Sequence, residues 1–202
     1  MNDPAVLDVS SLPTYAFGRR DPRWVAVMLL IAIEATVFGL MIFAYFYSRL
    51  RLEIWPPTAV GPRELMFGGS ILATLLASVW PAHRVNVAVY AGRLRQARFW
   101  LLITTVLSFA ALVLRGSELA NLPFRWDSNV FGSLFWGVLS LHTMHLVAGN
   151  IENLLFLALL YRGPVEKKHL VDLEVNGVYW YFVVLAWLPL YAVFYGEGLL
   201  PW

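Results

Sequence analysis

The feature that most constrains this sequence is an apolar run over residues 24–47 that carries one acid, Glu34, near its middle. At about 1.5 Å of rise per residue, a helix of this length crosses a hydrocarbon layer of roughly 30 Å. A carboxylate at the centre of such a layer costs at least about 2.5 kcal/mol unless it is neutral or paired. The face around Glu34 is otherwise apolar, with Phe38, Met41 and Tyr45 at helical spacing, so the sequence predicts a partner on another helix.

The composition indicates that the whole chain, not just this run, belongs in a membrane. Of its 202 residues, 59% are hydrophobic and 14% are charged, and the mean hydropathy is +0.65. Soluble domains carry about 25% charged residues. A net charge of +2 is too small to indicate a nucleic-acid partner, and the absence of cysteine excludes disulfides, thiolate chemistry and Cys-ligated metals.

Five apolar segments predict an all-α membrane protein with five transmembrane helices in one bundle. Residues 1–23 form a polar N-terminal arm without the apolar core of a signal peptide, so we expect the first span to direct insertion. Residues 24–202 form the transmembrane domain. The predicted spans cover residues 24–47, 65–80, 99–114, 130–161 and 177–195.

The distribution of Lys and Arg predicts the orientation of this bundle. Ten basic residues fall on the side of the N-terminus and five on the other, which places the N-terminus inside and the C-terminus outside. The ten are Arg19, Arg20, Arg23, Arg84, Arg93, Arg95, Arg98, Arg162, Lys167 and Lys168, and the five are Arg49, Arg51, Arg63, Arg115 and Arg125.

The fourth segment carries the densest polar group in the apolar part of the chain. At about 100° per residue, His142, His145, Gly149 and Glu152 fall within one arc, which predicts that they face the bundle interior, a cavity or a partner subunit. The two histidines lack the third and fourth ligands that a metal site needs, so we predict no metal or haem in this chain.

Three interpretations of Glu34 remain open from the residue alone. The carboxyl is a neutral, hydrogen-bonded structural lock, or part of a proton route, or a partner of a histidine across the bundle. In the third interpretation Glu34 faces His142 or His145, and one proton is shared between the two groups.

Several stretches together resemble subunit III of the haem–copper oxidases, the cytochrome c and quinol oxidase family, in a short, five-helix, bacterial-type form. The motifs lie in family order from about residue 24 to residue 196. They are Glu34-Ala-Thr-Val-Phe with the aromatic residues after it, Trp55-Pro56-Pro57-Thr58, Glu118, Leu141-His142-Thr143-Met144-His145, and the final helix with His169, Glu174 and Tyr179-Trp180-Tyr181-Phe182.

The chain also departs from the family pattern. Arg115 stands where the family has glutamine, Tyr181 and Val184 stand where it has histidine and aspartate, and Glu152 is an additional intramembrane acid. The first two helices of the seven-helix forms have no counterpart here.

The resemblance implies a non-redox accessory subunit of a respiratory terminal oxidase, without an active site of its own. The haems and copper are expected in partner subunits, chiefly the large subunit I, where oxygen reduction and proton translocation occur. The resemblance also implies bound phospholipid, with headgroup contacts at Arg84, Arg162 and His169, and a multi-pass location in the plasma membrane, with the mitochondrial inner membrane as the second choice.

Two other functions stay open at this stage. The first alternative is a subunit-III-like accessory protein of a nitric oxide reductase. The second is a small proton-coupled transporter with Glu34, Glu152 and the histidines along its path. The transporter ranks last because the sequence shows neither an internal repeat nor broken midplane helices.

Overall fold

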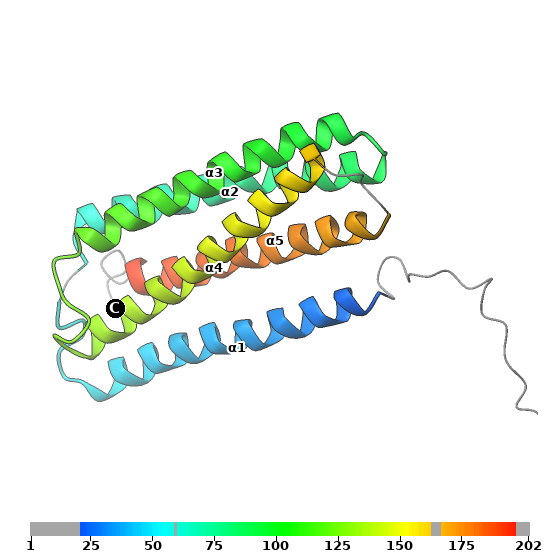
Figure 1. The fold of residues 1–202 in the computed structure, drawn as a ribbon. Coiled ribbons are helices and arrows are strands. Elements are labelled where there is room, and N and C mark those ends of the chain that lie inside the picture. Colours follow the sequence, from blue (N-terminus) through cyan, green and yellow to red (C-terminus); the bar gives the residue numbers. More distant parts are fainter. Residues whose placement is uncertain (1–20, 59, 163–166, 197–202) are drawn as a thin grey trace, which may run out of the picture.

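Five long helices account for most of the chain in the computed structural model, which describes residues 21–58, 60–162 and 167–196 (Figure 1). Within these residues there is no strand, and all five helices are long and apolar enough to cross a membrane. The predicted all-α, five-helix membrane fold is therefore confirmed. The helices are α1 (Pro22–Arg51), α2 (Pro62–Tyr90), α3 (Leu94–Ala120), α4 (Val130–Arg162) and α5 (Lys167–Gly196).

The helices extend beyond the apolar runs that predicted them, by ten residues at the end of α2 and by ten at the start of α5. This helix begins at Lys167, although the apolar run begins only at residue 177. Val171 and Leu173 in the additional turns are buried, but Asp172 and Glu174 alternate with them and lower the local hydropathy. The predicted start of α5 was wrong because packing, not mean hydropathy, decides where this helix begins.

The two ends of the bundle collect different connections. The start of α1, the α2–α3 turn, the end of α4 and the start of α5 lie at one end, here called the α1-start end (Figure 1). The α1–α2 and α3–α4 loops lie at the opposite end. This alternation is the one the charge count assumed, while the side of the membrane that each end faces remains a prediction. The arm before residue 21 lies outside the described residues.

The start of α1 is attached to α5 by charge. The Asp21 side chain accepts a hydrogen bond from the Arg23 backbone N–H, and Arg23 pairs with Asp21 at 2.7 Å and with Asp172 of α5 at 2.6 Å. The hydrogen bonds from Arg23 lower the pKa of the Asp21 carboxyl to about 2. The cap therefore stays ionised over the whole physiological pH range.

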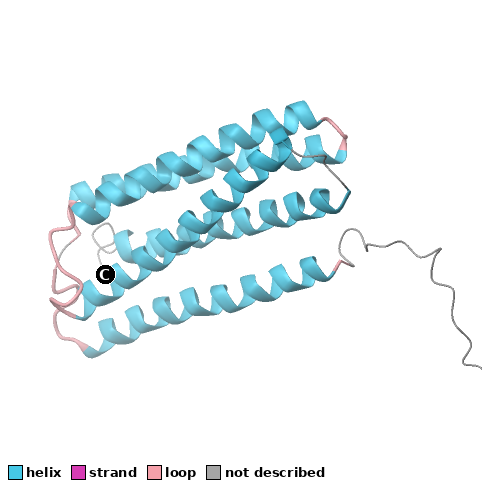
Figure 2. Cartoon of the chain, in the orientation of Figure 1, coloured by secondary structure: helices cyan, strands magenta, loops and turns pink. Residues whose placement is uncertain are grey.

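Helices α2 to α5 pack as a compact group, and α1 lies along one side of it (Figure 2). α1 packs mainly on α4 and α5 and buries only Phe38 and Tyr45. The core of the group is aromatic, with Trp180, Trp187 and Tyr195 of α5 among its largest fully buried side chains. α5 contacts α1, α2 and α4 and contributes more buried apolar side chains than any other helix, so it is the central helix of the fold.

Close helix contact between α2 and α5 depends on Gly68. A Cβ atom at this position would lie 2.7 Å from the Tyr195 ring, well inside van der Waals contact. Tyr195 cannot easily move away because its hydroxyl donates a hydrogen bond to Glu118.

We expect Gly68→Ala to destabilise the protein by about 1–3 kcal/mol, because an additional methyl group in a packed contact forces side chains or backbone to shift. The control is Gly39→Ala in α1, where nothing lies within 4 Å and alanine favours the helix by about 0.5–1 kcal/mol. Thermal unfolding of the purified, membrane-extracted protein measures both. Equal melting temperatures for the two variants would contradict the close contact.

Candidate functional site

The half-buried acid Glu34 contacts two side chains from other helices near the middle of the bundle. Its Oε1 lies 3.3 Å from Nε2 of His145 on α4, and the hydroxyl of Tyr179 on α5 donates to the same oxygen at 3.2 Å. These three residues, here called the Glu34 cluster, join α1, α4 and α5. The prediction that the partner of Glu34 comes from another helix matches this geometry.

The surroundings of His145 restrict where its protons can be. Nδ1 lies 2.6 Å from the backbone oxygen of Leu141, which can only accept, so Nδ1 carries a hydrogen. Nε2 faces the Glu34 carboxyl. A hydrogen bond between these two groups requires one proton, either on Nε2 or on the acid. The geometry can therefore hold a single proton between Glu34 and His145.

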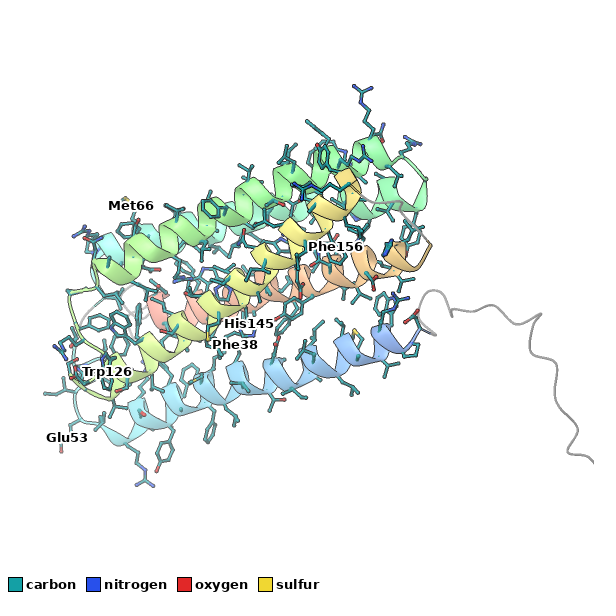
Figure 3. All side chains as sticks on the ribbon, viewed as in Figure 1. Phe38, Glu53, Met66, Trp126, His145 and Phe156 are labelled. Carbon is teal, nitrogen blue, oxygen red and sulfur yellow. The ribbon has the colours of Figure 1, made fainter. Side chains whose placement is uncertain are left out.

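His142 lies one turn away but takes a different partner. Its Nε2 is 3.1 Å from the backbone oxygen of Val183 on α5, and its ring packs against Trp187 with ring centroids 4.7 Å apart. Phe38 of α1 lies against both histidines, 5.2 Å from the His145 ring centre and 6.4 Å from that of His142. Figure 3 shows Phe38 and His145 between α1 and α4. Of the two candidate histidines, the structure brings only His145 to Glu34.

A second buried cluster lies nearer the opposite end of the bundle. Arg115 and Glu118 of α3 form an ion pair at 2.5 Å, both side chains fully buried, and the Tyr195 hydroxyl donates to the other carboxylate oxygen. The Arg115 guanidinium lies over the Trp187 ring, 4.0 Å from its centre. Sequence reasoning counted Arg115 as a basic residue on the outer side and missed this cluster. The i, i+3 spacing of Arg115 and Glu118 was the available signal.

A cavity of about 630 Å³ opens between α1, α4 and α5. Glu152 of α4 lines this cavity and is exposed in the isolated chain, so it lies outside the core that buries the histidines. Tyr179 lines the cavity too, which places the Glu34 cluster at the cavity wall. The remaining walls are mostly apolar, and the complete lining comprises Arg23, Ala26, Val27, Leu30, Ala148, Glu152, Leu155, Phe156, Leu159, Asp172, Val175, Asn176 and Tyr179.

Comparison with known proteins decides the family. Residues 19–199 match the family described as cytochrome c oxidase subunit III. The chain belongs to this family. It is 30% identical over 180 residues to cytochrome c oxidase subunit 3 of Triticum aestivum, covering 85% of this chain and 67% of the relative. The corresponding protein of Yarrowia lipolytica is 30% identical over 186 residues, covering 86% and 67%, and that of Arabidopsis thaliana is 28% identical over 181 residues, covering 85% and 67%.

The family resemblance drawn from the motifs is confirmed by these matches. The matched region of the subunit III family includes all five helices and both buried clusters. The chain spans about two thirds of the length of the relatives.

The other family-matching residues lie apart from the Glu34 cluster. Glu118 belongs to the Arg115 pair, and Glu174 of α5 hydrogen-bonds the Tyr90 hydroxyl at the end of α2. His169 lies in the first turn of α5, at the α1-start end. These residues do not form one site. Among the described residues, no three His, Asp or Glu side chains are placed to hold a metal ion.

The three residues predicted to contact lipid headgroups share the α1-start end but do not line the cavity. Arg84 lies over the rings of Trp80 and Trp100, at 5.9 Å and 5.5 Å from their centres. Arg162 is exposed as the last residue of α4. This position suits Arg84, Arg162 and His169 for contact with headgroups at one membrane surface, and headgroup binding itself stays a prediction.

Two substitutions of Glu34 should lower the stability of the protein by different amounts. Glu34→Ala removes both hydrogen bonds and should lower stability by about 1–3 kcal/mol. Glu34→Gln should lose less, because an amide oxygen at the position of Oε1 can still accept from Tyr179, and only the hydrogen bond to His145 is lost. Thermal unfolding of the purified protein tests the order, with Glu53→Ala in the exposed α1–α2 loop as control. A Gln variant as damaged as the Ala variant would contradict the hydrogen-bond geometry.

In the Arg115 cluster, the stability losses of single and double variants should not add. Arg115→Leu leaves Glu118 buried without its cation and should cost about 3–5 kcal/mol. The double variant Arg115→Leu/Glu118→Leu should lose less than Arg115→Leu alone, because no uncompensated charge remains. Arg95→Leu, at an exposed position in the first turn of α3, serves as control and should change stability by under about 0.5 kcal/mol. Unfolding in a denaturing detergent series measures all variants, and additive losses would refute the pairing.

Proposed function

We propose that this chain is the accessory subunit III of a respiratory haem–copper terminal oxidase. It packs against the large catalytic subunit I, which carries the haems and a copper, and contributes no redox centre itself. The observation that carries this proposal is the match of residues 19–199 to the cytochrome c oxidase subunit III family. On this proposal the complex reduces oxygen and translocates protons, and subunit III supports that activity by stabilising the assembly.

The exposed surface of α1 supports a role within a larger assembly. α1 has a buried face of only two side chains, and large apolar groups along its remaining surface are exposed. The exposed fractions of Ile33, Phe43 and Leu50 are 64%, 66% and 86%. In a membrane, such a surface is covered by lipid or by a neighbouring subunit.

The cavity beside α1 supports retention of a phospholipid. Its walls are mostly apolar, and its volume of about 630 Å³ suits part of an acyl chain. Arg23 at its edge is already paired with Asp21 and Asp172, so it is poorly placed to hold an anionic headgroup. We therefore assign headgroup contacts to Arg84, Arg162 and His169 at the same end of the bundle, and acyl-chain contact to the cavity.

The Glu34 cluster serves this role as a lock for α1. Glu34, His145 and Tyr179 give α1 a polar attachment to both α4 and α5, in addition to the contacts of Phe38 and Tyr45. The proton held between Glu34 and His145 removes the cost of an isolated buried charge. By fixing α1, the cluster keeps the lipid cavity and the apolar surface in one shape, which supports steady proton uptake by the complex.

The location of the complex follows from the same proposal. The chain is a multi-pass membrane protein, and we propose the plasma membrane of a bacterial cell as its site. The relatives named above come from plants and a yeast, for which the corresponding compartment is the mitochondrial inner membrane. Fractionation of the source cells, followed by detection of this chain, distinguishes the two membranes.

Purification through a tag on this chain, in a mild detergent, tests the proposed function. We expect a large haem- and copper-containing subunit to accompany it, with an oxidase optical spectrum and with phospholipid detectable by mass spectrometry. A partner with haem and non-haem iron would instead identify a nitric oxide reductase. A colourless, solitary protein from membranes that contain an intact oxidase would refute the accessory-subunit role and favour the transporter alternative.

A further inference from the structure

A small pocket with three asparagines in its wall lies inside the bundle, and it shares only Asn176 with the cavity beside α1. It is enclosed by α2, α3, α4 and α5, and its volume is about 10 Å³. A cavity of about 10–15 Å³ is the smallest that holds one water molecule, provided that the site offers two to four polar partners. The lining residues are Ala82, Val85, Asn86, Leu101, Thr104, Asn153, Leu173, Asn176, Gly177 and Trp180.

Two of the lining side chains present unpaired polar atoms of complementary type. Oδ1 of Asn86 on α2 is a buried acceptor without a partner, and Nδ2 of Asn153 on α4 is a buried donor without a partner. The Asn153 side chain cannot turn to satisfy itself, because its Oδ1 already accepts from Nδ2 of Asn176 at 2.9 Å. Asn153 is only 2% exposed, so bulk solvent cannot accept a hydrogen bond from it. Each such unpaired group costs about 1–3 kcal/mol.

The backbone is arranged to admit the Asn86 amide at this position. A Cβ on Gly177 of α5 would lie 2.7 Å from Asn86 Nδ2 and 3.0 Å from its Oδ1, so a larger residue there would displace the amide. Thr104 provides a further acceptor at the pocket, because its hydroxyl donates to the Trp100 carbonyl and keeps a lone pair free. A donor, an acceptor and a hydroxyl oxygen therefore surround a space of one water volume.

We propose that this pocket is a hydration site that holds one resident water molecule. The water accepts a hydrogen bond from Asn153 Nδ2 and donates one to Asn86 Oδ1, and its second hydrogen faces the Thr104 hydroxyl oxygen. α2 and α4 are not a main packing pair, since each packs chiefly on α3 and α5. The water thus links two helices that have little direct contact, and through Asn176 it links both to α5.

A high-resolution electron cryomicroscopy map of the intact complex tests the site directly. We expect one isolated density peak within hydrogen-bond distance of Asn86 Oδ1 and Asn153 Nδ2. The absence of a peak here, in a map that resolves other buried waters, would overturn the proposal. A map in which the two asparagine amides bond each other directly would overturn it too. This test uses the native sequence, so it does not depend on whether a variant folds.

A double-mutant cycle in the same complex gives an independent test. Asn86→Ala and Asn153→Ala each break the bridge and should lower the melting temperature by about 2–4 °C. The melting temperature of the double variant should fall by clearly less than the sum of the two single losses. The reason is that the second substitution removes a group that has already lost its hydrogen-bond partner. The matched control pairs Asn153→Ala with Ile71→Val, a buried apolar substitution in α2 about 22 Å along the helix from Asn86, and this pair should act additively. Additive losses for the asparagine pair would refute the bridge.

Discussion

A carboxyl group buried in hydrocarbon needs a partner, and in this protein that requirement holds the outermost helix in place. Glu34 accepts a hydrogen bond from the Tyr179 hydroxyl and lies 3.3 Å from Nε2 of His145, so α1 is bound to α4 and α5 at mid-depth. The Arg23–Asp172 pair repeats this attachment at the start of α1. Because α1 buries few side chains of its own, these polar contacts determine where it lies, and the cavity beside it depends on that position.

The remaining polar groups follow the same rule at other depths. The Arg115 cluster joins α3 to α5, and the hydrogen bond between Asn176 and Asn153 joins α5 to α4. The rings of Phe38 and Trp187 lie between the Glu34 cluster and the Arg115 cluster. All three polar groups include side chains of α5. These contacts explain why α5 occupies the centre of the bundle, although polar residues interrupt its apolar sequence. An accessory subunit built this way is rigid inside and apolar outside, as packing against a membrane partner requires.

Sequence reasoning succeeded where one helix carries the whole signal. The spans, the isolated acid and the two histidines could be read from spacing alone, and the ordered motifs identified the subunit III family. It failed where partners come from different helices. Arg115 was counted with the loops, although Glu118 follows it at i+3, because the Trp187 ring that covers it lies on α5, 72 residues later in the sequence. The choice of His145 over His142 was equally hidden, because both share one helical face and only the position of α1 separates them.

The sequence by itself determined that the chain crosses a membrane five times and that an acid lies within the first span, because hydropathy and helical rise are local properties. Only the tertiary structure decided which groups meet: Glu34 with His145 and Tyr179, Arg115 with Glu118 and Tyr195, Asn153 with Asn176. It also decided that Glu152 faces a cavity. These outcomes depend on how helices rotate and cross, which follows from packing contacts such as Gly68 against Tyr195 that no single segment specifies.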